Sequence, residues 1–178
     1  MKKKSEAHET LSLMFKHDGV PPHMIAENSK EQSLGEFQRK CREVDFHLVN
    51  TEPCSPWQKA AEGCIKQIKK SSSRKLISSG APNKLWDHCI ELMALIRSHT
   101  SHTSYELQGE VPETIITGQT ADISNICKYD WYEWVMFLDN ITSYPEDRRT
   151  LGIYLGPAID AGSSLCYKIL KSDGNITC

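Results

Sequence analysis

The chain has 178 residues, of which 39% are hydrophobic and 25% are charged, with 10 Gly and 8 Pro. This composition fits one ordinary domain with an appendage, or two small domains, and it excludes a collagen, a coiled coil and a wholly disordered chain. No stretch approaches the roughly 18 apolar residues that a membrane span needs, and the basic start of the chain runs into polar residues instead of the apolar core of a signal peptide. We therefore expect an intracellular protein, nuclear or cytoplasmic, that is not secreted and has no membrane partner.

The seven cysteines are scattered along the chain without a CxxC pair. Neither a disulfide framework nor a zinc ribbon is indicated, so we expect reduced thiols and no zinc. The charge is unevenly distributed, because residues 1–84 hold 15 Lys and Arg against 10 Asp and Glu, whereas residues 85–178 hold 6 against 13. Only the first half has the charge expected of a protein that binds a polyanion.

The first 50 residues predict alternating helices and strands. A short apolar run ends a helix before Asp18-Gly19 and two prolines. Met24-Ile25-Ala26 predicts a short buried strand with Glu27 at its carboxyl end. Residues 34–44 place apolar side chains at helical spacing, and residues 46–49 alternate as a second strand. This order of elements is typical of an α/β fold.

Residues 57–77 predict a long helix with a strongly basic exposed side. Its predicted apolar face consists of Ala60, Ala61, Cys64, Ile65 and Ile68. Its only acidic residue is Glu62, and its cations are Lys59, Lys66, Lys69, Lys70, Arg74 and Lys75. Each cation that neutralises a phosphate releases a counterion, so this side is suited to binding duplex DNA without reading its sequence. The alternative interpretation is an ordinary solvated helix face.

The second half begins with a further helix at residues 85–96, whose mostly apolar pattern predicts packing on more than one side. Residues 98–109 are rich in Ser, Thr and His and read as a linker, in which we interpret His99 and His102 as incidental and not as metal ligands. Beyond them, short strand-like pieces at residues 131–137, 151–155 and 167–170 predict a small β-rich module. We expect its aromatic residues to form its core and not a base-stacking surface; they are Trp131, Tyr132, Trp134 and Phe137.

The best candidate for chemistry is the pair of carboxylates Glu27 and Glu62. In a strand, helix, strand, helix arrangement, the end of the first strand and the start of the later helix can converge, and two carboxylates there would hold a divalent cation such as Mg²⁺. The alternative is that both are solvated surface residues, which is the usual state of a glutamate.

Several segments, in colinear order and covering nearly the whole chain, resemble the integrase core of Ty1/copia-type retrotransposon polyproteins. In that family a strand ends in a catalytic Asp, and a later "T-x-P-Y-S/T-P" block runs into "A-E" with the catalytic Glu. The matching segments are residues 24–32, Phe37 with Cys41, residues 51–57, residues 60–62, residues 85–89, residues 112–114 with 118–120, and residues 151–157.

The resemblance implies an α/β fold with a partial ribonuclease H-like integrase core and following helix in residues 1–97. A linker or connector in residues 98–127 and a small SH3-like β-barrel module in residues 128–178 would follow. It also implies an Asp, Asp, Glu triad that binds Mg²⁺ or Mn²⁺ and joins DNA 3′ hydroxyls to target DNA, with Glu27 and Glu62 as catalytic and metal-binding residues and the basic helix on the DNA.

The first Asp of that triad has no counterpart in this sequence, and Glu27 stands where the family has Asp. The extra methylene moves the carboxylate by roughly 1.5 Å, which matters where ligand geometry is tight. We therefore expect a fragment of a retrotransposon integrase that is catalytically incompetent alone and has DNA, other polyprotein segments or integrase copies as partners. The alternatives are a non-catalytic nucleic-acid-binding or partner-binding module derived from such an element, and an unrelated carboxylate hydrolase.

Overall fold

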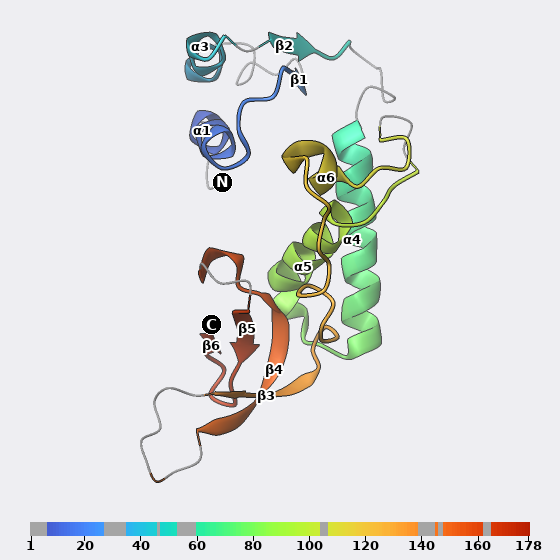
Figure 1. Ribbon diagram of the computed structural model, residues 1–178, viewed down its shortest axis with the longest axis vertical. Helices are drawn as coiled ribbons and strands as arrows, with labels where there is room; N and C mark the ends of the chain where they lie inside the picture. The colour runs from blue at the N-terminus through green and yellow to red at the C-terminus, as the bar shows by residue number, and fades with distance from the viewer. Residues whose placement is uncertain are drawn as a thin grey trace. The chain divides into compact units, whose positions relative to one another are not determined.

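The chain divides into two compact units, residues 1–63 and residues 64–178. The computed structural model describes residues 7–26, 35–45, 47–52, 60–103, 107–138, 145, 148–161 and 165–178 (Figure 1). The described residues form helices, one pair of parallel strands and one four-stranded antiparallel sheet, so the α/β class is confirmed. The boundaries expected near residues 97 and 127 stay predictions.

The first unit contains two helices and two parallel strands. These are α1 (Ala7–Asp18), β1 (His23–Ala26), α3 (Glu36–Glu43) and β2 (His47–Asn50). All four lie within a few residues of the positions that the sequence predicts. β1 and β2 pair in parallel, with Met24 opposite Leu48. Because α3 connects the two strands, the segment is a strand, helix, strand unit.

The core of the first unit lies between α1 and α3. Leu11, Phe37 and Cys41 are buried there, and Met24 and Leu48 pack against them. Phe37 and Cys41 are four residues apart, so they share one face of α3.

The prediction that β1 is buried is wrong. Ile25 is 55% exposed, and in β1 only Ala26 is buried. Successive side chains of a strand point to opposite faces, so Ile25 points away from Met24, which packs against the core between α1 and α3.

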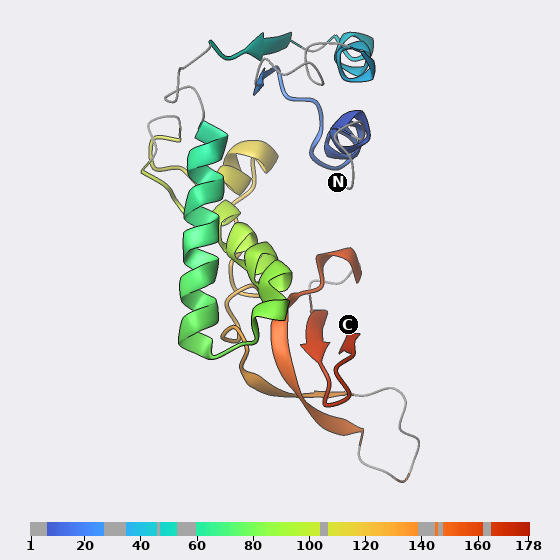
Figure 2. The ribbon, with the colours of Figure 1, turned by 180° about the vertical axis from the view of Figure 1, so that it is seen from behind.

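A long helix, α4 (Ala60–Ser79), begins in the last residues of the first unit and continues into the second, where it is followed by η3 (Asn83–Leu85) and α5 (Trp86–Ser98). Figure 2 shows α5 beside α4. The two helices meet at small side chains: the buried Cys89 thiol donates a hydrogen bond of 3.6 Å to the backbone carbonyl of Ser72, which is itself buried.

The apolar face predicted for α4 is only partly correct. Ala61, Cys64 and Ile65 are exposed, whereas Ser72 is buried and Leu76 packs against the core. Near the start of the helix the neighbouring side chain from α5 is the Arg97 guanidinium, which donates to the Cys64 sulfur at 3.8 Å. The first turns of α4 therefore face a polar side chain, so they do not need an apolar face for packing.

A short helix, α6 (Pro112–Thr117), lies in the segment expected to be a connector, and the sequence reasoning did not predict it. Proline at its first position suits the fixed backbone angle there, and Gly118 ends the helix in the left-handed conformation with φ of 72°. Pro112 and Gly118 thus mark the start and the end of this six-residue helix.

The sheet of the second unit has the order β3-β4-β5-β6, and every neighbouring pair is antiparallel. Its strands are β3 (Trp134–Leu138), β4 (Arg149–Pro157), β5 (Tyr167–Leu170) and β6 (Ile176–Thr177), with η4 (Ile159–Ala161) after β4. The three predicted strands are confirmed, and β6 is additional.

β4 carries core residues on both of its faces. Tyr154 is fully buried with Val135 and Ile169 on one face. Leu155 points the opposite way and is buried with Leu92 of α5. α5 therefore covers one face of the sheet near this end of β4, as Figure 1 shows.

Two glycines of β4 are explained by close packing. A Cβ on Gly152 would collide with Cγ2 of Ile169 and would lie 3.0 Å from Cε1 of Phe137. Gly156 has φ of 133°, and the register of the pairing with β5 shifts between Tyr154 and Gly156. A residue with a side chain rarely adopts such a φ, so the bend at Gly156 favours glycine.

Candidate nucleic-acid interface

Of the two predicted carboxylates, the structure describes one. Glu62 lies in the first turn of α4 and is exposed, whereas Glu27 lies outside the described residues. In the part of the chain that the structure describes, no three His, Cys, Asp or Glu side chains gather as a group that could hold a metal ion. The distance between Glu27 and Glu62 stays a prediction, at roughly 4 to 8 Å.

The cations of α4 are exposed along one side of the helix. Lys66, Lys70 and Arg74 follow one another at intervals of four residues, and Lys69 lies next to them. Residues three and four apart are neighbours on a helix surface. We call these four residues the α4 cation row. Within the described part of the chain, none of the four forms an ion pair.

Glu62 belongs to the same side of the helix, because it precedes Lys66 by four residues. Glu62 is the one acidic residue of α4 and lies in its first turn. The positive charge of this side therefore increases from the start of the helix toward Arg74. Lys59, the remaining cation predicted at the start of this helix, lies outside the described residues.

Lys75 differs from the cation row because it has a structural partner. Its ammonium group donates a hydrogen bond of 2.5 Å to the carboxylate of Asp130, on the segment that leads into β3. This hydrogen bond lowers the pKa of the Asp130 carboxyl below its usual value. Lys75 therefore joins α4 to the segment before the sheet, and its predicted contact with nucleic acid remains a prediction.

The aromatic residues of the β-rich module are divided between core and surface. Trp131 is buried and Phe137 packs against the core, as predicted. Trp134 is 63% exposed, contrary to the prediction. It alternates along β3 with Met136 and Leu138, which are also exposed, while Val135 and Phe137 occupy the opposite face.

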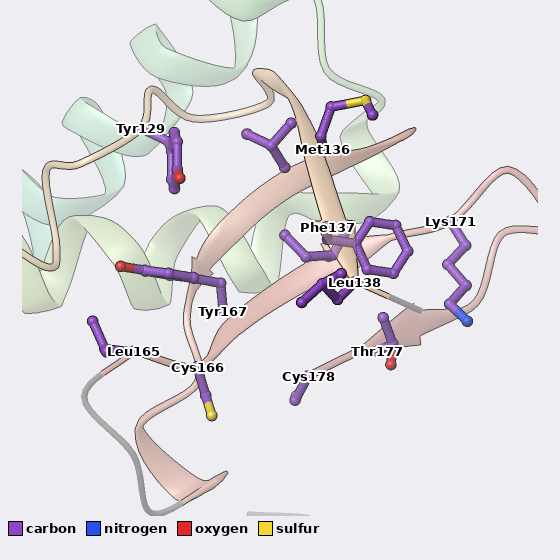
Figure 3. Close-up of a pocket in the computed structure, with 12 residues that line it drawn as sticks. Tyr129, Met136, Phe137, Leu138, Leu165, Cys166, Tyr167, Lys171, Thr177 and Cys178 are labelled. Atoms are coloured by element: carbon purple, nitrogen blue, oxygen red, sulfur yellow. The ribbon is translucent and has the colours of Figure 1, made fainter. Parts of the chain in front are cut away.

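A cavity of about 440 Å³ lies on the face of the sheet opposite to α5 (Figure 3). Tyr129 and Tyr167 line it, and their rings are 5.7 Å apart in an edge-to-face arrangement. The ammonium of Lys128 lies 5.5 Å and 5.9 Å from the centres of these two rings. The Tyr167 hydroxyl is buried and has no hydrogen-bond partner among the described residues. The sequence reasoning missed this cavity, because its lining comes from Tyr129 and from several separate strands.

The two histidines after α5 have a structural role. Nδ1 of His99 lies 3.0 Å from the carbonyl oxygen of Leu95, and Nε2 of His102 lies 2.6 Å from that of Arg97. With the ring N–H as donor, each adds a hydrogen bond to a carbonyl in the last turn of α5 that also accepts from a backbone amide, at 3.2 Å from His99 to Leu95 and at 3.4 Å from Thr100 to Arg97.

No family model and no curated protein matches the chain. Its fold is similar to that of a chain in the structure titled "CryoEM structure of simian T-cell lymphotropic virus intasome in complex with PP2A regulatory subunit B56 gamma". The TM-score is 0.53 and the sequence identity is 16%, over 99% of this chain and 62% of that chain. The chain thus spans less than two thirds of the length of the chain that it matches, and the likeness is one of fold. Among the described residues no helix is both long and apolar enough to cross a membrane.

Proposed function

We propose that this chain is a DNA-binding part of an integrase-related protein, and that the α4 cation row contacts the phosphates of the DNA. The observation that carries the proposal is the exposure of Lys66, Lys69, Lys70 and Arg74 on one side of a helix without an ion-pair partner among the described residues. Four residues of helix rise about 6 Å, so Lys66, Lys70 and Arg74 span about 12 Å along the helix axis. The fold likeness to a chain of a viral intasome structure supports this assignment.

The finer assignment is to the Ty1/copia type of integrase, as a fragment of its polyprotein. Residues 1–97 would then hold the later half of a ribonuclease H-like core, and residues 128–178 would be the SH3-like module. Two observations support it. The parallel pair β1 and β2 is joined through a helix, and the C-terminal part of the chain forms an antiparallel sheet of short strands. Other polyprotein segments and integrase copies are the protein partners that this assignment proposes.

We expect no end trimming or strand transfer by this chain with Mg²⁺ or Mn²⁺. The triad proposed for the family needs three carboxylates, and the sequence offers Glu27 and Glu62, with Glu27 one methylene longer than the family's Asp. Metal ions held by both carboxylates would neutralise charge on the reacting phosphate. An assay on short labelled duplexes with either cation tests this. Turnover that disappears in the Glu62→Gln variant would show that the site is active.

The DNA-binding proposal is tested by changing charge on α4 and, separately, elsewhere. The test variant replaces Lys66, Lys69, Lys70 and Arg74 by Gln. The matched control makes the same four-charge change at exposed cations outside α4, and these are Lys16, Arg42, Lys128 and Arg148. Affinity for a labelled duplex is measured by fluorescence anisotropy over a series of salt concentrations. Each lost phosphate contact lowers the slope of log K against log salt by about 0.9, so four contacts account for up to about 3.6.

The two variants separate a local contact from the net charge of the chain. The proposal expects the test variant to lose most of the salt slope and the control to keep it. Equal losses in both variants would show that binding follows net charge, and an unchanged slope in the test variant would exclude α4 as the DNA-binding surface. Two unrelated duplex sequences should bind equally well, because phosphate contacts carry no sequence information.

A further inference from the structure

A groove of about 400 Å³ lies between α4 and the start of α5, directly beside the α4 cation row. Its lining combines a cation, two hydroxyls, an amide, an indole and three aliphatic side chains. They are Lys69, Ser72, Ser73, Leu76 and Ile77 of α4, Asn83 of η3, and Trp86 and Ile90 of α5. Lys69 belongs both to the groove and to the cation row, so the two surfaces are continuous.

Two large apolar side chains in this groove do not pack in the hydrophobic core. Trp86 is 58% exposed and Ile77 is 79% exposed, and both lie outside the buried clusters of the second unit. The neighbouring Leu85 is buried in the core and anchors the start of α5. This anchor fixes the position of the adjacent Trp86 on the surface. An exposed indole held in this way offers a flat apolar ring to a ligand.

The charges around the groove are those expected of a site for a polyanion. Among the described residues no carboxylate lines it, whereas Lys69 does. The two charged residues beside Trp86 are exposed and opposite in sign, Lys84 and Asp87. Asp87 accepts a hydrogen bond from the backbone amide of His88, at the start of α5. The surface at Trp86 is therefore close to neutral, and the surface along α4 is positive.

We propose that this groove binds an unpaired base of a single-stranded nucleic acid, with the base stacked on Trp86 and the flanking phosphates on the cation row. The inference rests on the proposed function and adds the form of nucleic acid that is preferred. A positively charged track with an aromatic platform beside it is how proteins bind single strands without sequence preference. In a duplex the bases are already stacked and paired, so they cannot reach Trp86. A single-stranded or frayed segment can use both surfaces.

The lining favours a base over an acidic amphipathic peptide. A helical peptide needs several apolar contacts in sequence, at positions i, i+3 or i+4, and i+7. The groove offers one large aromatic surface, and the Asn83 amide and the Ser73 hydroxyl lie in the same lining. An amide can both donate to and accept from the edge of a base. The groove volume lies within the range of about 300 to 1,000 Å³ that is typical of small-ligand sites.

The experiment compares two exposed tryptophans on two forms of DNA. Trp86→Ala is the test variant, and Trp134→Ala is the matched control, because Trp134 is also exposed but lies on β3, outside the groove. The probes are a fluorescein-labelled 20-nucleotide oligo(dT) and a labelled 20-base-pair duplex, both measured by anisotropy with the full chain. Stacking of one base predicts that Trp86→Ala weakens oligo(dT) binding by about 5- to 150-fold. Duplex binding should change less than about twofold, and Trp86→Phe should restore part of the loss.

The outcomes separate this inference from the proposed function. If the four-charge variant of α4 loses duplex binding while Trp86→Ala leaves oligo(dT) binding unchanged, the groove inference is wrong and the proposed function stands. If neither DNA binds the unmodified chain, both are wrong. An equal loss on both probes would show that Trp86 supports the fold, which circular dichroism and the urea midpoint would reveal. A 15-residue peptide of Glu and Leu that binds more tightly than oligo(dT), and depends on Trp86, would assign the groove to a protein partner.

Discussion

Gly152 in the middle of β4 is the position where the smallest substitution should have the largest effect on stability. An added methyl group would collide with Cγ2 of Ile169 and would lie 3.0 Å from Cε1 of Phe137 and 3.2 Å from the carbonyl oxygen of Leu170. Ile169 is buried and cannot turn aside without moving its neighbours. The Leu170 oxygen is backbone and is fixed by the pairing of the strands.

The expected cost of Gly152→Ala follows from these contacts. Adding a methyl group to a packed core typically destabilises a protein by about 1–3 kcal/mol. Loss of the conformational freedom of glycine in the unfolded chain offsets about 0.4–1 kcal/mol of that cost. Because the collision with the buried Ile169 places this site at the upper end of that range, we expect a net decrease in the free energy of unfolding of about 2 kcal/mol. Because Ile169→Ala removes the atom that collides, the double variant should cost less than the sum of the two single variants.

The assay is urea unfolding followed by tryptophan fluorescence, which reports mainly on residues 64–178 because three of the four tryptophans lie there. The matched control is Gly63→Ala in α4, where an added Cβ meets nothing within 4 Å. Alanine is the better helix former, so this control should stabilise the chain by up to about 1 kcal/mol. An unchanged or raised midpoint in Gly152→Ala, or strictly additive costs with Ile169→Ala, would refute the packing described for this glycine.

Three further predictions concern the second unit. Asp130→Asn should destabilise the chain by less than about 1 kcal/mol, because the Asp130 side chain of its ion pair with Lys75 is 76% exposed. The folded-state pKa of Asp130 is lowered, so this stabilisation is complete above the ordinary Asp pKa near 4 and disappears as the pH falls through the lowered pKa. The unfolding midpoints of Asp130→Asn and the unmodified chain should therefore converge once the pH lies below that lowered pKa. Tyr154→Phe removes the hydrogen bond of the Tyr154 hydroxyl to a backbone carbonyl and should cost about 0.5–1.5 kcal/mol in thermal or urea unfolding, whereas no change would mean that the bond is not formed. Iodoacetamide followed by mass spectrometry should modify the exposed Cys64 quickly and leave Cys89 unmodified, since burial raises the pKa of the Cys89 thiol and closes access to it; equal rates would contradict that burial.

Most helices and strands of this fold can be predicted from local patterns. The spacing of Phe37 and Cys41 identifies α3, and the turn signals of Pro and Gly delimit its neighbours. These patterns act within a few residues of the chain, so they can be read without knowing the partner of each element. The same is true of α4, whose length is predicted to within three residues at each end.

What the sequence does not contain is which element covers which face. The exposure of Ile25 and of Trp134 was not predicted. A strand pattern shows that successive side chains point to opposite faces, but it does not show which of the two faces another element covers. Likewise, α4 packs through Ser72, a residue that no hydrophobic pattern would select. A small side chain is needed where two helices approach closely, and that approach depends on the contact with Cys89 of the other helix.

The candidate site was predictable to a similar degree. The cations of α4 could be identified from the sequence as one surface, because residues on one helix keep their relative positions. The separate role of Lys75 could not, since its partner Asp130 lies 55 residues further along the chain. The groove at Trp86 was missed for the same reason, because its two walls come from different helices and its exposed indole resembles a core residue in the sequence.

The outer face of β3 has a practical consequence for any preparation of this protein. Among the strands that the structure describes, β3 pairs only with β4, so one of its edges carries unpaired backbone groups beside the exposed Trp134, Met136 and Leu138. An apolar strand with an open edge is a template for another strand, and aggregation then increases with protein concentration and with time. A lysine at Met136 would place a charge in the middle of this strand without touching either buried cluster. We expect that single change to raise the concentration at which the chain remains monodisperse.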